Sequence, residues 1–240
     1  MHQLLTSPST SAPRRPFSRR RSIVAQTGIE EIRVCTNKTC RRQGSFQTLQ
    51  NLTDLSPPNV IVKASGCLGS CGSGPNVAVL PQGTIVSHCG TASHAVHLVC
   101  NPKDGSLRKN LDALSLRRSA EAELECCDFA KAEHLLSQAI DLNPHCGIHN
   151  LLRLRSSTRL SLNDKTGALE DARKALELFP QHVEARICEG DALMAMEQYD
   201  AAENSYAICL QIDPSIRRSK SFKAKISRLN EKLVNVTSSS

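Results

Sequence analysis

The sequence predicts two successive architectures, a small α/β domain and then an all-α domain. Between positions 30 and 100, short stretches rich in β-branched residues alternate with segments of helical periodicity, in the order β-α-β-β-β-α. Beyond position 110 the strand patterns stop, and three helical segments end in a matching way at Pro144, Pro180 and Pro214. Their spacing is close to the period of about 34 residues that indicates helix pairs stacked into a solenoid.

The N-terminal segment 1–28 has the composition of an organelle transit peptide. It is rich in Ser, Thr, Pro and Arg, contains no Asp or Glu, and has no apolar stretch long enough for a secretory signal. The Ser, Thr and Pro content and the Val-x-Ala-like end near Ala25 favour the chloroplast, in the stroma or at the stromal face of the thylakoid. The mitochondrial matrix is the alternative location. A disordered basic tail is the other interpretation of residues 1–28.

The net charge of +7 does not indicate nucleic-acid binding. Five arginines of the transit segment supply most of it, and the rest of the chain is only slightly basic. The chain has no Trp and two Tyr, so it lacks the aromatic platforms on which bases stack. No apolar run approaches the roughly 20 residues of a membrane-spanning helix. We therefore expect no nucleic-acid partner and no transmembrane segment, with at most a peripheral association with a membrane complex.

The α/β domain is expected at residues 29–100. Its strands and helices follow from alternating and β-branched patterns and from helical periodicity, with the turn Pro81-Gln82-Gly83-Thr84 between the last two strands. Strands are predicted at 30–35, 59–66, 76–80 and 84–88, and helices at 42–55 and 91–100. This order suits a small sheet with helices packed against it.

Four cysteines in this domain form two pairs, each at the end of a predicted strand. Cys35-x4-Cys40 is the first pair and Cys67-x3-Cys71 is the second. The chain has eleven cysteines, an odd number, and no secretory signal, which favours metal ligands or redox thiols over disulfides. Four thiolates on neighbouring loops can hold an iron–sulfur cluster, and the glycines of the segment GCLGSCGSGP let the backbone close around it.

The segments VCTNKTC and GCLGSCGSGPNVAVLPQGTIVSHCG resemble the thioredoxin-like 2Fe-2S ferredoxins, the family of the ferredoxin-like subunit of respiratory complex I. The resemblance covers about residues 30–100 and implies a thioredoxin-like ferredoxin domain. It also implies a 2Fe-2S cluster as cofactor, with four metal ligands: Cys35, Cys40, Cys67 and Cys71. Structural zinc and a dithiol–disulfide switch are the alternatives, although the spacings depart from the C-x2-C of zinc knuckles and the C-x-x-C of redox sites.

Residues 111–214 resemble three tetratricopeptide (TPR) repeats. Small residues recur where paired helices must touch, twelve and five positions before each of the three prolines: Ala132, Ala168 and Ala202, then Ala139, Ala175 and Cys209. Residues 101–110 are expected to be a linker. Residues 215–235 are expected to form a capping helix through Phe222, Ile226, Leu229 and Leu233, and residues 236–240 a disordered tail.

The repeats imply a groove that binds a protein client. Chaperone-adaptor repeats carry Lys and Asn where they clamp a C-terminal carboxylate. The corresponding residues here are Arg117, Glu121, Leu154, Glu184 and Cys188, which does not favour such a clamp. No arrangement typical of hydrolases or transferases is present, so a non-catalytic protein is expected.

Taken together, these patterns predict a plastid iron–sulfur protein whose TPR domain binds a client. The expected role is an assembly or scaffold factor for a photosynthetic or related complex. The first alternative is an electron-transfer or redox-sensing adaptor. The second is a zinc-binding or metal-free TPR adaptor.

Overall fold

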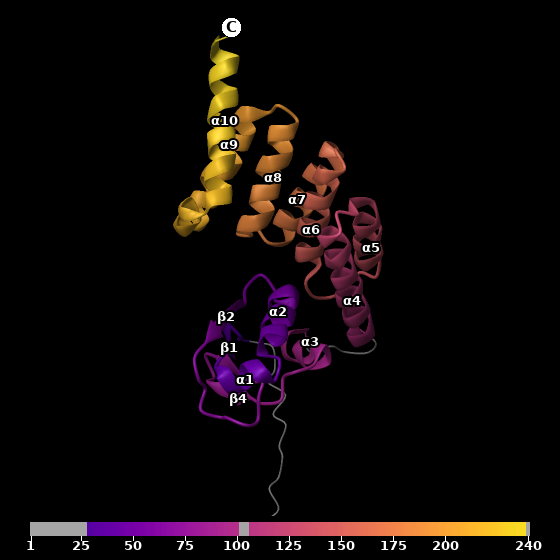
Figure 1. The fold of residues 1–240 in the computed structure, drawn as a ribbon, viewed down its shortest axis with the longest axis vertical. Helices are drawn as coiled ribbons and strands as arrows, with labels where there is room; N and C mark the ends of the chain where they lie inside the picture. The colour runs from indigo at the N-terminus through magenta and orange to yellow at the C-terminus, as the bar shows by residue number, and fades with distance from the viewer. Residues whose placement is uncertain (1–27, 101–105, 239–240) are drawn as a thin grey trace, which may run out of the picture.

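The computed structural model describes residues 28–100 and 106–238, and it combines a small sheet with a stack of helices (Figure 1). We call residues 28–100 the head and residues 106–238 the repeat domain. The predicted transit peptide lies outside the described residues except for Gly28, as does half of the predicted linker. In the described ranges no helix is long and apolar enough to cross a membrane.

The head is built on a four-stranded mixed sheet with the order β2-β1-β3-β4. The strands are β1 (Glu31–Cys35), β2 (Ile61–Ser65), β3 (Val77–Leu80) and β4 (Thr84–Val86). β1 runs parallel to β2 and antiparallel to β3, and β3 is antiparallel to β4. All four strands lie within the predicted ranges, because runs of β-branched residues between turn residues are a local signal.

Three helices complete the head: α1 (Lys38–Arg42), α2 (Ser45–Leu55) and α3 (Ala92–Cys100). The helix predicted at 42–55 corresponds to α2, which begins at Ser45, whereas α1 precedes it and was not predicted. Gly44 separates them because its φ of +90° lies in the left-handed region, which interrupts a right-handed helix. The side chain of Asn37 accepts a hydrogen bond from the backbone N–H of Lys38 and caps α1.

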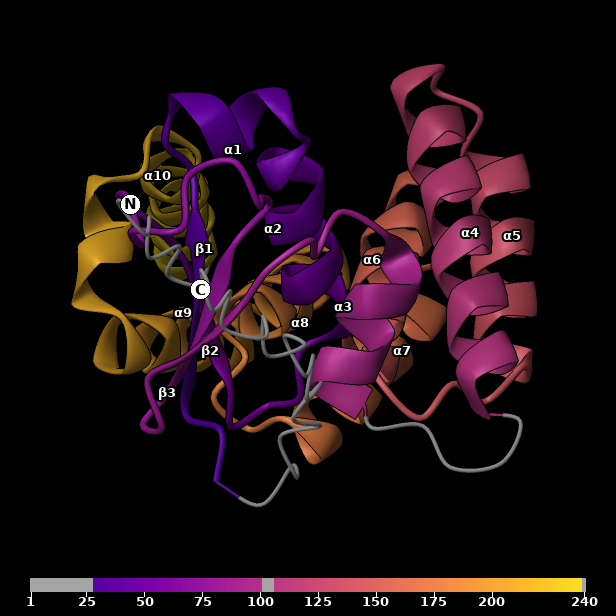
Figure 2. The same cartoon turned by 90° about the horizontal axis from the view of Figure 1, so that it is seen from below.

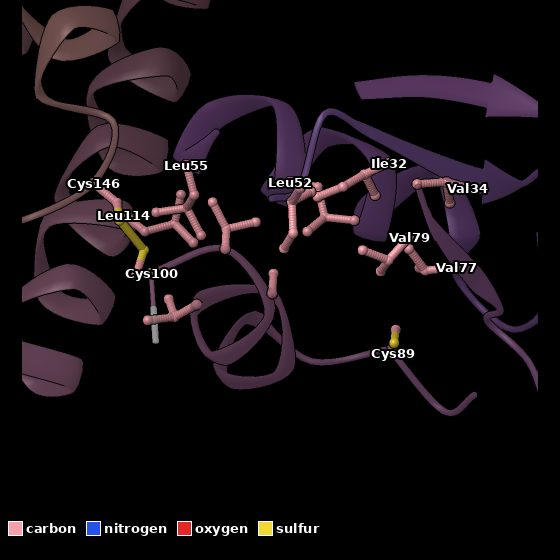
Figure 3. Packing of buried hydrophobic residues seen from close by; sticks show 14 residues of the cluster. Ile32, Val34, Leu52, Leu55, Val77, Val79, Cys89, Cys100, Leu114 and Cys146 are labelled. Carbon is pink, nitrogen blue, oxygen red and sulfur yellow. A yellow bond between two sulfur atoms is a disulfide. The ribbon is translucent and has the colours of Figure 1, made fainter. Parts of the chain in front are cut away.

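The hydrophobic core of the head lies on one face of the sheet, under α2 and α3 (Figure 2). Ile32 and Val34 of β1 are fully buried there, together with Leu52 of α2 (Figure 3). Leu114 and Cys146, which belong to the repeat domain, are part of the same cluster. The head and the first repeat therefore share one core.

Six helices form three antiparallel pairs in the repeat domain, and they follow one another in chain order along the stack (Figure 1). They are α4 (Ser106–Glu125), α5 (Phe129–Asp141), α6 (Ile148–Ser161), α7 (Lys165–Leu178), α8 (Val183–Ala195) and α9 (Tyr199–Ile212). The six small residues predicted at the helix contacts all have no exposed surface. The prediction of tetratricopeptide repeats is confirmed. α4 begins at Ser106, inside the range expected to be linker.

The turn inside each repeat has the same backbone form. Cys127, Asn163 and Glu197 follow the first helix of their repeats with φ between 61° and 64°. In the first two repeats an aspartate comes next, Asp128 or Asp164, and its side chain accepts the hydrogen bond of a backbone N–H three positions later. Cys127 thus occupies a structural turn position.

The stack ends in a short 3-10 helix, Pro214–Arg218, and in α10 (Lys220–Ser238). Phe222 and Leu229 of α10 are almost completely buried against α8 and α9. The ring of Phe222 meets that of Tyr206 edge to face, with 5.7 Å between centroids. Ile226 and Leu233 pack on the same cluster, so α10 covers the apolar face of the last repeat. The helix also continues into the range expected to be a disordered tail.

Candidate functional site

The four cysteines predicted as ligands lie at one edge of the sheet, and we call them the cysteine cluster. Cys35 ends β1 and Cys40 lies in α1, whereas Cys67 and Cys71 lie on the loop that joins β2 to β3. Parallel neighbouring strands end at the same edge, so the loops after β1 and β2 are adjacent. Cys35 and Cys40 are buried, while Cys67 and Cys71 are exposed.

The exposed pair is close, with 3.4 Å between the Sγ atoms of Cys67 and Cys71. The backbone N–H of Gly69 donates to Cys67 Sγ over 3.5 Å. On the buried side, the Asn76 amide donates to Cys40 Sγ over 3.6 Å and to the Ser70 carbonyl over 2.6 Å. Asn76 therefore links the loop that carries Cys71 to the helix that carries Cys40.

Gly74 allows this loop to pack against α1. A Cβ atom at Gly74 would lie 2.4 Å from Gln43 Oε1 and 2.8 Å from Cys40 Sγ, which is closer than real Cβ contacts. The side chain of Gln43 also donates to the Gly72 carbonyl over 3.4 Å. The glycine context noted in the sequence thus has a packing reason that does not depend on a metal.

Hydrogen bonding shifts the pKa values of the two exposed thiols in opposite directions. The N–H of Gly69, followed by the thiol of Cys71, lowers the pKa of Cys67, because both stabilise its thiolate. The neighbouring Cys67 raises the pKa of Cys71, with smaller contributions from burial and from Cys40 and Cys35. Burial raises the pKa of Cys40. Within the cluster, Cys67 is thus the cysteine whose thiolate form is stabilised by hydrogen bonds.

A second group of polar residues joins the head to the repeat domain. Asp54 near the end of α2 forms an ion pair with Arg117 of α4, with 2.7 Å between Oδ1 and Nη2. The Asn150 amide of α6 donates to the Asp54 backbone carbonyl over 3.1 Å. Arg118 also bonds to Asn51 of α2. The end of α2 is therefore held by both α4 and α6.

A disulfide between Cys100 and Cys146 closes this contact, with 6.0 Å between the Cα atoms (Figure 3). The cysteine pattern favoured metal ligands and redox thiols over disulfides, and this disulfide was not predicted. The two cysteines are 46 residues apart and belong to different domains. No local spacing marks such a pair, and only the tertiary contact brings them together.

Arg117 has counterparts in the other repeats. Counted back from the proline that closes each repeat, Arg153 and Ile187 occupy the same position as Arg117. We call the face of α4, α6 and α8 that carries these three positions the inner face. Arg117 is almost completely buried under the head, whereas Arg153 is half-buried. In the described ranges the Arg153 guanidinium makes no hydrogen bond or ion pair.

Comparisons with known proteins point to the repeats. Residues 189–216 match the tetratricopeptide repeat family. The Protein STIP1 homolog of Dictyostelium discoideum is 33% identical over 103 residues, which are 43% of this chain and 18% of that protein. The Protein SGT1 homolog of Oryza sativa subsp. japonica is 33% identical over 91 residues, which are 38% of this chain and 24% of that protein. The chain thus spans less than a quarter of the length of either relative.

Among solved structures, the first TPR of Spaghetti (RPAP3), bound to the HSP90 peptide SRMEEVD, is similar to part of this chain. The sequence identity is 18%, the TM-score is 0.47, and the match covers 52% of this chain and 95% of that one.

These findings correct the predicted cofactor and function. In residues 28–100 and 106–238, no three Cys, His, Asp or Glu side chains are grouped so as to hold a metal ion. The matching relatives are homologs of STIP1 and SGT1, and residues 189–216 match the tetratricopeptide repeat family. The predictions of a thioredoxin-like 2Fe-2S ferredoxin, of its 2Fe-2S cluster and of a plastid iron–sulfur assembly factor are wrong, as are electron transfer and zinc binding. The motif spacing suggested a shared ion, but the thiols lie as a buried pair and an exposed pair. The chain carries tetratricopeptide repeats on a small α/β head.

Proposed function

We propose that the chain is a non-catalytic adaptor whose repeat domain binds an acidic segment of a partner protein. The observation that carries the proposal is the ion pair of Arg117, because it shows an arginine of the inner face holding a carboxylate at 2.7 Å. Asp54 supplies that carboxylate within the chain. The same repeat position in the second repeat holds Arg153, whose charge interacts with that of Glu184 but which forms no ion pair in the described ranges. Its guanidinium can therefore pair with a carboxylate of another protein.

The surroundings of Arg153 suit a segment with both acidic and apolar residues. Ile187, at the equivalent position of the third repeat, is partly buried and contributes an apolar contact. Ser157, one turn further along α6, is also half-buried and uses its hydroxyl within the helix, on the Leu154 carbonyl. A guanidinium beside an apolar residue recognises a carboxylate and a neighbouring aliphatic side chain together.

Peptide binding to the full chain tests the proposal. The probe is fluorescein-labelled SRMEEVD, the peptide bound in the RPAP3 structure, because it combines acidic residues, an apolar residue and a free carboxylate. Fluorescence anisotropy should show saturable binding that weakens with added salt. Arg153→Ala should weaken binding about tenfold, which corresponds to about 1.4 kcal/mol.

Arg108→Ala is the matched control, because the Arg108 side chain lies on α4 with 90% of its surface exposed and only a surface ion pair with Asp112. It should bind the peptide like the unaltered chain. Absence of binding to the unaltered chain, or equal binding by Arg153→Ala, would contradict the proposal.

Delivery to the chloroplast is a separate part of the proposal, supported by the composition of residues 1–28. A fluorescent protein fused after residue 28 should enter chloroplasts, and the same fusion lacking residues 1–28 should stay outside. Import into mitochondria instead would support the alternative location. For the head, the strand order β2-β1-β3-β4 is compatible with the thioredoxin-like arrangement suggested by the sequence, as a fold without a cluster.

A further inference from the structure

The proposed peptide binding by the inner face does not use the cysteine cluster, which brings two exposed thiols together. We propose that Cys67 and Cys71 form a reversible disulfide by thiol–disulfide exchange with small-molecule disulfides of the glutathione type. The site is thus a redox modification site on the head, at the edge of the sheet where β1 and β2 end.

The distance between the two sulfur atoms supports this bond. The Sγ atoms of Cys67 and Cys71 are 3.4 Å apart, and a disulfide requires about 2.05 Å. The loop that carries them contains Gly69 and Gly72, with φ of +88° and +98°. A Cβ atom built at either glycine meets nothing within 4 Å, so the backbone around the pair has room to adjust. A small local movement is enough to close the bond.

Access and hydrogen bonding assign different roles to the two thiols. Both are exposed, so a disulfide from solution can approach them. The N–H of Gly69 donates to the sulfur of Cys67, and such a donor stabilises the thiolate that attacks in exchange reactions. Cys67 is therefore the attacking thiol, and Cys71 is the one that resolves the intermediate.

The exchange balances in two steps. The Cys67 thiolate attacks one sulfur of the glutathione disulfide, forms a mixed disulfide and releases one glutathione thiolate. Cys71 then loses its proton to water and attacks Cys67 Sγ. The bond between Cys67 and glutathione breaks, and a second glutathione thiolate leaves. The two cysteines are oxidised by two electrons, and one glutathione disulfide is reduced to two thiols.

The other free thiols provide contrasts inside the same chain. Cys35 and Cys40 are each 2% exposed, so glutathione disulfide cannot reach their sulfur atoms. Cys126 and Cys127 are exposed but lie in the turn of the first repeat. The extent of their modification shows how an exposed thiol outside the head reacts under the same conditions.

The test is a redox titration of the full chain in glutathione buffers of increasing disulfide content. The reaction is quenched with acid, free thiols are alkylated, and the digested peptides are analysed by mass spectrometry. The peptide with both Cys67 and Cys71 should lose two hydrogens and escape alkylation. Cys71→Ser should instead accumulate glutathione on Cys67, whereas Cys67→Ser should leave Cys71 largely unmodified. Cys126→Ser should behave like the unaltered chain.

Three results would overturn the inference. One is the absence of a Cys67–Cys71 disulfide at every buffer ratio. Another is glutathione addition to Cys67 of the Cys71→Ser variant no faster than to Cys126. The third is a purified chain that retains a metal on these thiols by elemental analysis, since bound thiolates would not exchange. None of these results bears on Arg153, so peptide binding is judged separately.

Discussion

Asp54 at the end of α2 and Arg117 in α4 form an ion pair across two domains, and their side chains are only 2% and 7% exposed. Burial raises the pKa of Asp54, and the charge of Arg117 opposes that shift only in part. The pair thus carries a desolvation penalty, and its main effect is to fix where the head lies. If Asp54 were lost, the buried Arg117 would keep only its ion pair with Glu121, whose side chain is 35% exposed.

Asp54→Ala should therefore destabilise the chain by about 3 kcal/mol, because the buried Arg117 keeps only its pair with the partly exposed Glu121. The free energy of unfolding in urea measures this loss. The double variant Asp54→Ala with Arg117→Met should recover most of it, since both charges are gone. Asp112→Ala, which removes an exposed partner of Arg108, should cost less than about 1 kcal/mol. Equal effects of Asp54→Ala and Asp112→Ala would show that the interdomain pair is not the anchor.

Stability should depend on pH through His149. Burial lowers the pKa of His149 to about 4, with a smaller contribution from His182, whose ring centroid is 5.3 Å away. The unfolded chain binds this proton near pH 6.5, so acid favours unfolding. The stabilisation is complete above about pH 6.5 and should fall by on the order of 3 kcal/mol toward pH 4.

Urea unfolding at a series of pH values measures this dependence. His149→Gln should flatten the decrease between pH 6.5 and 4, whereas His134→Gln, at an exposed position, should leave it unchanged. Hydrogen bonding to His182 lowers the pKa of Glu184 to about 2. The contribution of Glu184 to stability is therefore lost only at lower pH, below about 4.5. A decrease of the same size in His149→Gln would assign the pH dependence to other groups.

Gly190 should not tolerate a methyl group. A Cβ atom there would lie 2.5 Å from Cε1 of Tyr206, a residue that is 1% exposed and whose hydroxyl donates to Asp191 over 2.7 Å. Gly190→Ala should cost about 1 to 3 kcal/mol through overpacking, measured as a lower midpoint of urea unfolding. Gly66→Ala is the control, because a Cβ at Gly66 meets nothing within 4 Å. A midpoint unchanged in both variants would mean that Tyr206 moves freely.

The Cys100–Cys146 disulfide should stabilise the contact between head and repeats. The bonded cysteines are 46 residues apart in the sequence. For a loop of this length, loop-closure entropy predicts a stabilisation of at most about 4 kcal/mol. The double variant Cys100→Ala with Cys146→Ala should unfold at lower urea concentration than the oxidised chain and should no longer respond to dithiothreitol. If dithiothreitol lowers the stability of this variant as much as that of the unaltered chain, the disulfide has no such role.

The sequence could predict what depends on neighbouring residues. The β-branched runs located all four strands, and the recurring alanines such as Ala132 and Ala168 located the helix contacts, because both patterns reflect local geometry. The start of α2 after Gly44 and the short helix α1 were missed, since helical periodicity marks neither a short helix nor an exact boundary. The pairing of Asp54 with Arg117 was also missed, because the two lie far apart in the sequence and only the packed fold brings them together.

The cysteine cluster shows a different limit. The spacing of Cys35, Cys40, Cys67 and Cys71 correctly indicated that they come from adjacent loops, because β1 and β2 are parallel neighbours. It did not reveal that Cys35 and Cys40 are buried while Cys67 and Cys71 reach solvent. Spacing describes which residues approach one another, whereas burial and hydrogen bonds decide what chemistry they carry.

The core shared by the head and the first repeat makes the two parts a single cooperative unit. Leu114 and Cys146 belong to the cluster built on the strands of the head, so opening the contact would expose apolar surface on both sides. Fragments cut between residues 101 and 105 should accordingly associate or aggregate and should not behave as two independent domains. The change of sequence pattern between the two parts therefore does not mark a boundary between independently stable domains. Hydrogen exchange should protect the backbone amides of α3 and α4 to the same degree, whereas those of α10 should exchange earlier.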